Sequence, residues 1–228
     1  MKNSQIGRSE GAPRLFSYTI PVDDGAAPNP FRGMCSLAIC KPAIRRVAKR
    51  DDWVAGLGSK NAPSGNLSGR LVYAMRVDEV LSLRDYDLEA VSRWPDRIPK
   101  SGSLDLSEKL GDCIYDYSLG TPSQRSGVHK PENVTKDLGG ENVLLSWDFY
   151  YFGRQAKELP QHLREICHQT QGHRSDLNDP YVEDFVEWVR SLPPGMCGWP
   201  DFMFDWVSDS GCPACTVRRL DVEHDPPC

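Results

Sequence analysis

The spacing of apolar residues along the chain predicts strands through roughly its first two thirds. β-Branched and aromatic residues predict a strand over residues 14–22. Residues 70–81, RLVYAMRVDEVL, alternate apolar with mixed positions and are typical of a half-buried strand. Further strands are expected at 111–117 and 142–153, with a short one beginning at Trp53. These segments are separated by long polar loops, so strands and loops are predicted to dominate up to residue 153.

Helical spacing begins at Pro42, a first-turn proline, and places Ile44, Val47 and Ala48 on one side of the segment. Ser82 is a typical N-cap residue for a second helix. Residues 155–171 and 179–192 predict two more helices, and the latter segment is strongly amphipathic. The combination predicts a mixed α/β fold of the α+β type.

The domain organisation follows from the same pattern. Residues 1–13 are polar and are expected to form a flexible leader, and residues 14–192 a single α/β domain. Within that domain we expect a core over 14–153 and a helical extension over 154–192. Residues 193–228 are rich in Gly, Pro, Asp and Cys and are expected to form an irregular tail.

Charge and cysteine content narrow the class of protein. The chain has 228 residues and a formal net charge of −5, but residues 1–76 carry 12 Lys and Arg against 5 Asp and Glu. This local excess predicts a basic face, or merely an unevenly charged solvated surface. No segment approaches the roughly 18 apolar residues of a membrane span, and no signal peptide is visible. The eight cysteines are therefore expected to be reduced and the protein cytoplasmic.

The basic excess surrounds a group of residues suited to binding a nucleotide. A base needs aromatic faces and polar groups that read its edge, and phosphate needs Arg or Lys. The candidates in this region are Asn29, Phe31, Lys41, Arg45, Arg46 and Trp53. The alternative is structural: a rigid turn at residues 28–31, Trp53 in the core, and a solvated helix face carrying the basic side chains.

Three further candidates lie later in the chain. His129 and His173 each occur in a polar loop, and Asp112 follows a glycine where it could bind a base edge or cap a turn. Cys40 follows an apolar segment and is expected in the core. A nucleophilic role would need a nearby base, and the sequence identifies none. No cofactor is predicted. A zinc site is a weaker alternative, formed by Cys212, Cys215, His224 and Cys228.

Familiar enzyme signatures are missing from the sequence. It contains no phosphate-binding P-loop, no Rossmann glycine fingerprint, no G-x-S-x-G and no H-E-x-x-H. This lowers the expectation of a familiar enzyme but does not exclude an unfamiliar one.

Several ordered segments carry a family resemblance. They are PNPFRGMCSLAICKPAIRR, DDWVAGLGSK, GRLVYAMRVDEVL, GDCIYDY, VLLSWDFYYFG and QGHR. In these the chain resembles the bacterial and phage nucleotide-modification-associated domain family, second type, from about residue 16 to about residue 200. The family pattern has Gly-Asp before the tryptophan, whereas this chain has Asp51-Asp52-Trp53. The strand order is also similar to the PUA-like group that includes EVE, ASCH and YTH domains, which implies a small β-barrel flanked by helices.

The resemblance implies a function connected with base modification, and three classes remain open. The leading expectation is a module that binds a modified base or nucleotide in DNA or RNA, with proteins of a base-modification system as further partners. The second is an enzyme of unknown reaction, with His129, His173 or Asp112 as acid or base. The third is a protein-interaction subunit without a ligand pocket.

Overall fold

The computed structural model describes residues 11–167 and 172–201. Its α-helices are α1 (Pro42–Val47), α2 (Leu83–Ser92), α3 (Leu106–Lys109), α4 (Val134–Leu138) and α5 (Val182–Arg190). Its strands are β1 (Leu15–Ile20), β2 (Cys35–Leu37), β3 (Trp53–Gly58), β4 (Arg70–Arg76), β5 (Glu79–Ser82), β6 (Tyr115–Asp116), β7 (Ser123–Gln124), β8 (Asn142–Ser146), β9 (Phe149–Tyr151), β10 (Lys157–Glu158) and β11 (Gly195–Met196). Short 3-10 helices lie at Phe31–Gly33, Pro95–Arg97, Pro131–Asn133, Gly153–Gln155, Gln161–Ile166 and Asp176–Tyr181.

A six-stranded sheet forms the centre of the molecule. Its strand order is β1-β3-β4-β9-β11, and β10 pairs with β4. β1 and β3 are parallel, with Leu15 opposite Trp53, so the chain must cross over between them. That crossover contains β2 and α1. The topology therefore places α1 beside the sheet.

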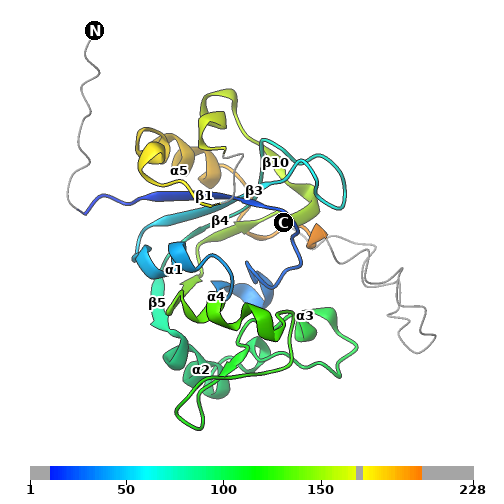
Figure 1. Ribbon diagram of the computed structural model, residues 1–228. Helices are drawn as coiled ribbons and strands as arrows, with labels where there is room; N and C mark the ends of the chain where they lie inside the picture. The colour runs from blue at the N-terminus through cyan, green and yellow to red at the C-terminus, as the bar shows by residue number, and fades with distance from the viewer. Residues whose placement is uncertain (1–10, 168–171, 202–228) are drawn as a thin grey trace.

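Both faces of this sheet are covered, which explains why every residue of β3 is buried. On one face, Trp53 and Ala55 of β3 pack with Phe185 and Val189 of α5. On the other, Val54 shares a core with Tyr18 of β1 and with Ile44 and Ala48 at α1. Figure 1 shows α5 on one side of β1, β3 and β4, and α1, α2 and α4 on the opposite side.

A smaller sheet lies on the α1 side, with strand order β2-β8-β5. Val143 and Leu145 of β8 pack against Leu83, Tyr86 and Ala90 of α2. The chain between α2 and β8 contains the β6–β7 hairpin and α4, and α4 contacts α1. This layer brings a polar loop near residue 129 next to the beginning of α1.

Several predicted elements are confirmed. The first strand and the helix beginning at Pro42 are present, and the Ser82 hydroxyl caps α2 by accepting the backbone N–H of Asp85 at 3.0 Å. The mixed α/β class is also confirmed. Asp51 occupies the place of the expected glycine and adopts a φ of 71°, so the left-handed turn is kept with a non-glycine residue.

Other predictions are wrong. The segments 70–81 and 142–153 each form two strands rather than one, since the chain bends after Arg76 and again at Trp147. In the described part of the helix predicted at 155–171, a short strand and a 3-10 helix are found, and β11 lies within the predicted irregular tail. The described strands form separate sheets and not a closed barrel.

The expectation of reduced thiols is met only in part. Cys35, Cys40, Cys113 and Cys167 are free, whereas Cys197 is disulfide-bonded. Within residues 11–167 and 172–201, no helix has the length and apolar character needed to cross a membrane.

Candidate active site

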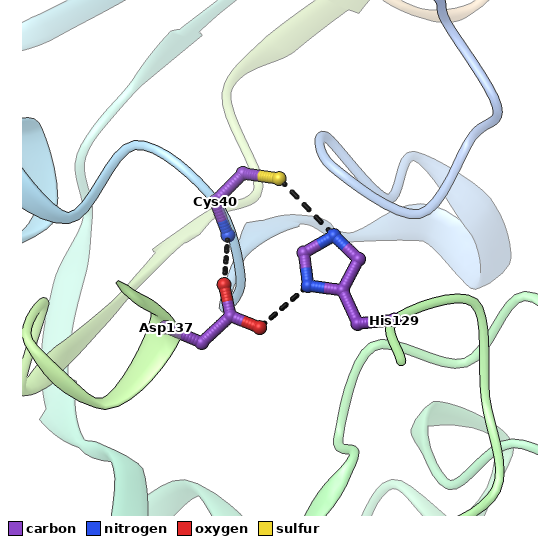
Figure 2. A group of neighbouring side chains, drawn as sticks. All are labelled: Cys40, His129 and Asp137. Atoms are coloured by element: carbon purple, nitrogen blue, oxygen red, sulfur yellow. Dashed lines mark hydrogen bonds and ion pairs between the residues drawn. The ribbon is translucent and has the colours of Figure 1, made fainter. Parts of the chain in front are cut away.

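A cysteine, a histidine and an aspartate form a hydrogen-bonded chain beside α1. The Sγ atom of Cys40 lies 3.2 Å from Nε2 of His129, and Nδ1 of the same ring lies 2.5 Å from Oδ2 of Asp137. The other carboxylate oxygen, Oδ1, accepts the backbone N–H of Cys40 at 2.9 Å. Figure 2 shows the imidazole lying between the thiol and the carboxylate. This is the order of groups that activates a nucleophilic cysteine.

The backbone at Cys40 is held in a conformation that side chains seldom adopt. Cys40 has a φ of 57°, and Lys41, the N-cap residue of α1, has a φ of 40°. Two successive non-glycine residues in the left-handed region cost roughly 1–3 kcal/mol each, and such strain concentrates at functional sites. The conformation turns the chain sharply between β2 and α1, so that the thiol is presented at the turn.

The buried guanidinium of Arg45 holds this turn in place through hydrogen bonds to backbone carbonyls. Arg45 is completely buried, and its Nε donates to the carbonyl of Cys40 at 2.8 Å. Its two terminal nitrogens donate to the carbonyls of Asn142 at 2.6 Å and Asp137 at 2.5 Å. One side chain therefore ties together the cysteine turn, α4 and the start of β8.

The histidine and the aspartate come from neighbouring parts of one polar segment. Asp137 is in α4, is fully buried, and also accepts the Tyr115 hydroxyl at 3.1 Å. The carbonyl of His129 accepts the side-chain amide of Gln124 at 2.9 Å, which ties the histidine loop to β7. The histidine side chain is mostly buried, with 15% exposed, so its ring has little freedom to leave the aspartate.

The charges of this group stabilise one another. Burial lowers the pKa of His129, but its bond to Asp137 and its contact with Cys40 outweigh burial and raise that pKa to about 10. Burial opposes ionisation of Asp137, yet His129 and the N–H of Cys40 hold the pKa of this carboxyl below its usual value. His129 is therefore an imidazolium at neutral pH. The positive ring lies 3.2 Å from Sγ, where it can stabilise negative charge that develops on the sulfur during a reaction.

The same three residues also meet the minimum composition of a metal site, because one ligand atom from each lies within 4.8 Å of the others. Their arrangement favours a relay instead. His129 uses one ring nitrogen for Cys40 and the other for Asp137, so the two contacts diverge. Metal ligands converge on one point and typically include a fourth group.

Cys40 opens onto a cavity of about 740 Å³. The cavity lies between the end of β1 and the beginning of α1, and its lining is mostly apolar. Its lining residues are Tyr18, Thr19, Ile20, Pro21, Val22, Ala27, Cys40, Lys41, Pro42, Ala43, Ile44, Lys136, Gly172 and His173. The volume is in the range of cavities that hold a small ligand or a nucleotide. A strained cysteine therefore faces a ligand-sized space.

The structure brings together three of the residues singled out from the sequence. Lys41 and His173 line the cavity, and His129 contacts Cys40 at its edge. Arg46 is on the exposed side of α1, where it donates to the carbonyl of Gly139 at 3.3 Å.

The other candidates lie elsewhere. Trp53 packs against Tyr150 and Phe185 on the opposite face of the large sheet. Phe31 is buried against Trp199. Arg45 lies beneath the cysteine turn. The nine candidates therefore do not share one cavity, because the sheet separates Trp53 from the residues at α1.

Asn29 and Asp112 are buried in a polar cluster of their own. The Asn29 amide donates to the carbonyl of Leu110 at 2.8 Å and accepts from Arg97 at 2.6 Å. Asp112 accepts the hydroxyls of Ser36 at 2.6 Å and Tyr86 at 2.7 Å. These bonds join the loop before β2 to the chain that follows α2. The alternative zinc ligands, from Cys212 to Cys228, lie outside the described residues.

Sequence reasoning missed the partnership of Cys40 and did not consider Asp137 or Lys136. The base that Cys40 required is His129, which was itself a candidate but 89 positions away in the chain. The available signal was local. Cys40 directly precedes a helix-starting Lys-Pro pair, a place where a side chain is presented rather than buried.

Replacing His129 with glutamine is expected to destabilise the fold by about 3 kcal/mol near neutral pH, because it leaves buried Asp137 without its ionic partner. The folded-state pKa of His129, about 10, exceeds its unfolded value of about 6.5. The contribution of His129 to the free energy of unfolding is therefore full below about pH 6.5 and is lost as the pH rises towards 10. Asp137 has a lowered pKa, so the contribution also fades as the pH falls below about 4.

Urea denaturation of both proteins from pH 4 to pH 10 would measure this difference. His162→Gln at an exposed histidine is the matched control and is expected to change stability by less than about 0.5 kcal/mol. A His129→Gln difference that stayed constant across this range would contradict the ion pair.

The chain was compared with protein-family models, curated proteins and solved structures. The model of nucleotide modification associated domain 2 matches residues 12–210. No curated protein and no solved structure matches the chain. The matched range contains every residue of the cysteine site and of its cavity. The chain thus belongs to the nucleotide modification associated domain 2 family.

Proposed function

We propose that this protein is an enzyme of nucleotide modification in which Cys40 is the nucleophile. The Cys40–His129–Asp137 chain of hydrogen bonds carries the proposal. His129 acts as acid and base, and Asp137 holds its ring in one orientation and stabilises its positive form. The family association supplies the context of nucleotide modification.

The chemistry that suits this group is transfer of a carbon-centred group through sulfur. The Cys40 thiolate attacks an electrophilic carbon of the substrate, such as an acyl or amidino carbon, and a C–S bond forms. The leaving group departs with the proton of His129 Nε2. Water or an amine then attacks the thioester-type intermediate, gives its proton back to His129, and regenerates the thiolate. No oxidant or reductant is required.

A second candidate keeps the cavity but not the reaction. A module that binds a modified base or nucleotide, in DNA or RNA, needs an enclosed apolar space with a few polar groups. The cavity of about 740 Å³ with Lys41 and His173 in its lining favours that function. A PUA-like mode of base binding belongs to this candidate, as do nucleic acid and proteins of a base-modification system as partners.

The proposal predicts that, among the free cysteines of residues 11–167, iodoacetamide labels Cys40 fastest at pH 6. The imidazolium of His129 lies against the Cys40 sulfur and stabilises negative charge on it during attack, whereas burial raises the pKa values of Cys35, Cys113 and Cys167. Peptide mass spectrometry over a time course should show Cys40 reacting at least about tenfold faster than Cys167, which is partly exposed. If Cys40 reacts no faster than Cys167, it is not an activated nucleophile.

A covalent adduct separates the two candidate functions. The protein would be incubated with a panel of modified and unmodified nucleotides and oligonucleotides, quenched in acid and weighed intact. An adduct on Cys40 that Cys40→Ala lacks supports the enzyme. Equal affinity of the wild type and Cys40→Ala for one modified oligonucleotide, with neither adduct nor turnover, supports the binding module.

A further inference from the structure

We propose that the cavity beside Cys40 binds an anionic group of the substrate, a phosphate or a carboxylate, between the side chains of Lys41 and Lys136. The inference names the substrate class of the proposed enzyme and so rests on that function. It comes from the charges around the cavity, which are independent of the hydrogen bonds within the cysteine site.

The ammonium group of Lys41 has few hydrogen-bond acceptors around it. Its ammonium stands 4.2 Å from the centre of the Tyr18 ring and 3.4 Å from the carbonyl oxygen of Thr19. The carbonyl contact is long for a charged donor. The ring face attracts the ammonium as a cation–π contact, but it supplies no acceptor atom for a hydrogen bond. Among residues 11–167 and 172–201, no carboxylate forms an ion pair with Lys41 or Lys136. An ammonium that is partly withdrawn from water thus retains donors for a ligand.

The two lysines also repel each other. Burial lowers the pKa of Lys41, the charge of Cys40 raises it in part, and the positive charge of Lys136 lowers it again. An anion bound between them would reverse both effects, because it replaces lost hydration and cancels the repulsion. None of the described lining residues is a carboxylate, and the negative charge that the proposed function gives to the Cys40 sulfur is balanced by His129 at 3.2 Å.

The rest of the cavity limits the shape of the ligand. Ile20, Val22, Pro42 and Ile44 give it an apolar wall, and His173 stands at the same cavity with its ring 5.8 Å from that of Phe16. A purely anionic ligand would leave this apolar wall exposed to water. The substrate is therefore a small amphiphilic anion whose apolar part lies in the cavity and whose reacting carbon reaches Cys40.

Two alkylating reagents of similar size test the inference directly. Iodoacetate carries a carboxylate and iodoacetamide is neutral, so the ratio of their rates at Cys40 reports attraction of an anion and cancels the reactivity of the thiolate. The ratio is the rate for iodoacetate divided by the rate for iodoacetamide. At Cys40 this ratio is expected to be about ten times the ratio for glutathione, since clefts lined by one sign of charge raise the association of the opposite charge by 10-fold or more. It should fall as salt is added.

Matched variants identify the residues responsible. Lys41→Met is expected to bring the ratio close to the glutathione value, and Lys41→Arg to retain it. Lys136→Met should lower it in part, and this exposed position keeps the test open if Lys41→Met does not fold. Lys49→Met removes the same charge from an exposed position outside the cavity lining and should leave the ratio unchanged.

The two proposals fail in different ways. Rapid labelling of Cys40 by iodoacetamide with a ratio equal to that of glutathione overturns the anion site and leaves the nucleophile intact. Slow labelling by both reagents overturns the nucleophile. Protection of Cys40 from iodoacetamide then distinguishes the source of the anion: inorganic phosphate and a nucleoside monophosphate protect if the site takes phosphate, and acetate protects if it takes carboxylate. Protection by none of these overturns the anion site.

Discussion

His129→Ala is expected to slow alkylation of Cys40 by iodoacetamide about thirtyfold at pH 5. The proposed function pairs the Cys40 sulfur with the imidazolium as a thiolate. A free cysteine has a pKa of about 8.5, so a thiol without such a partner contains little thiolate at pH 5. A thiolate stabilised by a cation is intrinsically less nucleophilic, and this offsets part of the gain. The remaining difference is the thirtyfold loss.

The pH profile is more diagnostic than any single rate. Labelling of the wild type should remain almost level from pH 5 to pH 8, because His129 has a pKa of about 10 and keeps its charge over that range. Labelling of His129→Ala should rise about tenfold per pH unit up to about pH 8.5. The two curves should cross near pH 6.5, because a thirtyfold difference at pH 5 closes after about 1.5 pH units at about tenfold per unit.

Asp137→Asn is the partner measurement. The amide cannot stabilise the imidazolium, so the level region of the profile should shorten from its alkaline side. His162→Ala at an exposed histidine is the control and should reproduce the wild-type curve. If His129→Ala gave a level profile, His129 would not stabilise the thiolate, and the proposed Cys40–His129–Asp137 relay would be wrong. Protection of the wild type by added Zn²⁺ at equimolar concentration would instead favour a metal site.

Local signals in the sequence were sufficient where structure depends on neighbours along the chain. Pro42 marked the start of α1 and Ser82 capped α2, because first-turn prolines and hydroxyl caps act within a few residues. Alternation also revealed buried strands. It could not show that β4 ends at Arg76, since that bend depends on Asp51, Asp78 and Asp148, all of which pair with the Arg76 guanidinium.

The cysteine site could not be predicted in the same way. Its members are brought together by contacts that span 89 and 97 positions, and no spacing rule relates residues so far apart. Cys40 was assigned to the core from its apolar neighbours Leu37, Ala38 and Ile39, which are indeed buried. The left-handed turn at Cys40 and Lys41 takes the thiol out of that core, and no glycine marks the turn in the sequence.

The basic excess of the first 76 residues includes cations that have structural partners. Arg14 pairs with Asp52 at 2.6 Å, and Arg76 pairs with three aspartates. Arg45 is buried. Charge counted along the chain includes such structural cations, whereas the cavity is lined by Lys41 from this segment and by Lys136 from a later one.

Arg45→Met is expected to destabilise the protein by about 3–5 kcal/mol. Methionine replaces the stem of the side chain, but the carbonyls of Cys40, Asn142 and Asp137 lose their donor in a buried place. Burial of the guanidinium lowers its pKa to about 10 against the opposing charge of Asp137, and it still remains charged at neutral pH. The guanidinium is closely packed, because a methyl group at Gly140 would clash with its central carbon.

Arg46→Met, one position further along α1, is the matched control. Arg46 is exposed and makes one hydrogen bond of 3.3 Å, so its loss should cost less than about 0.5 kcal/mol. Urea denaturation at pH 7 measures both, and iodoacetamide labelling of folded Arg45→Met should also be slower, since Arg45 holds the Cys40 turn. Equal stability of the two variants would restore Arg45 to the role expected from the sequence, because a guanidinium that contributes nothing to folding is available to bind a ligand.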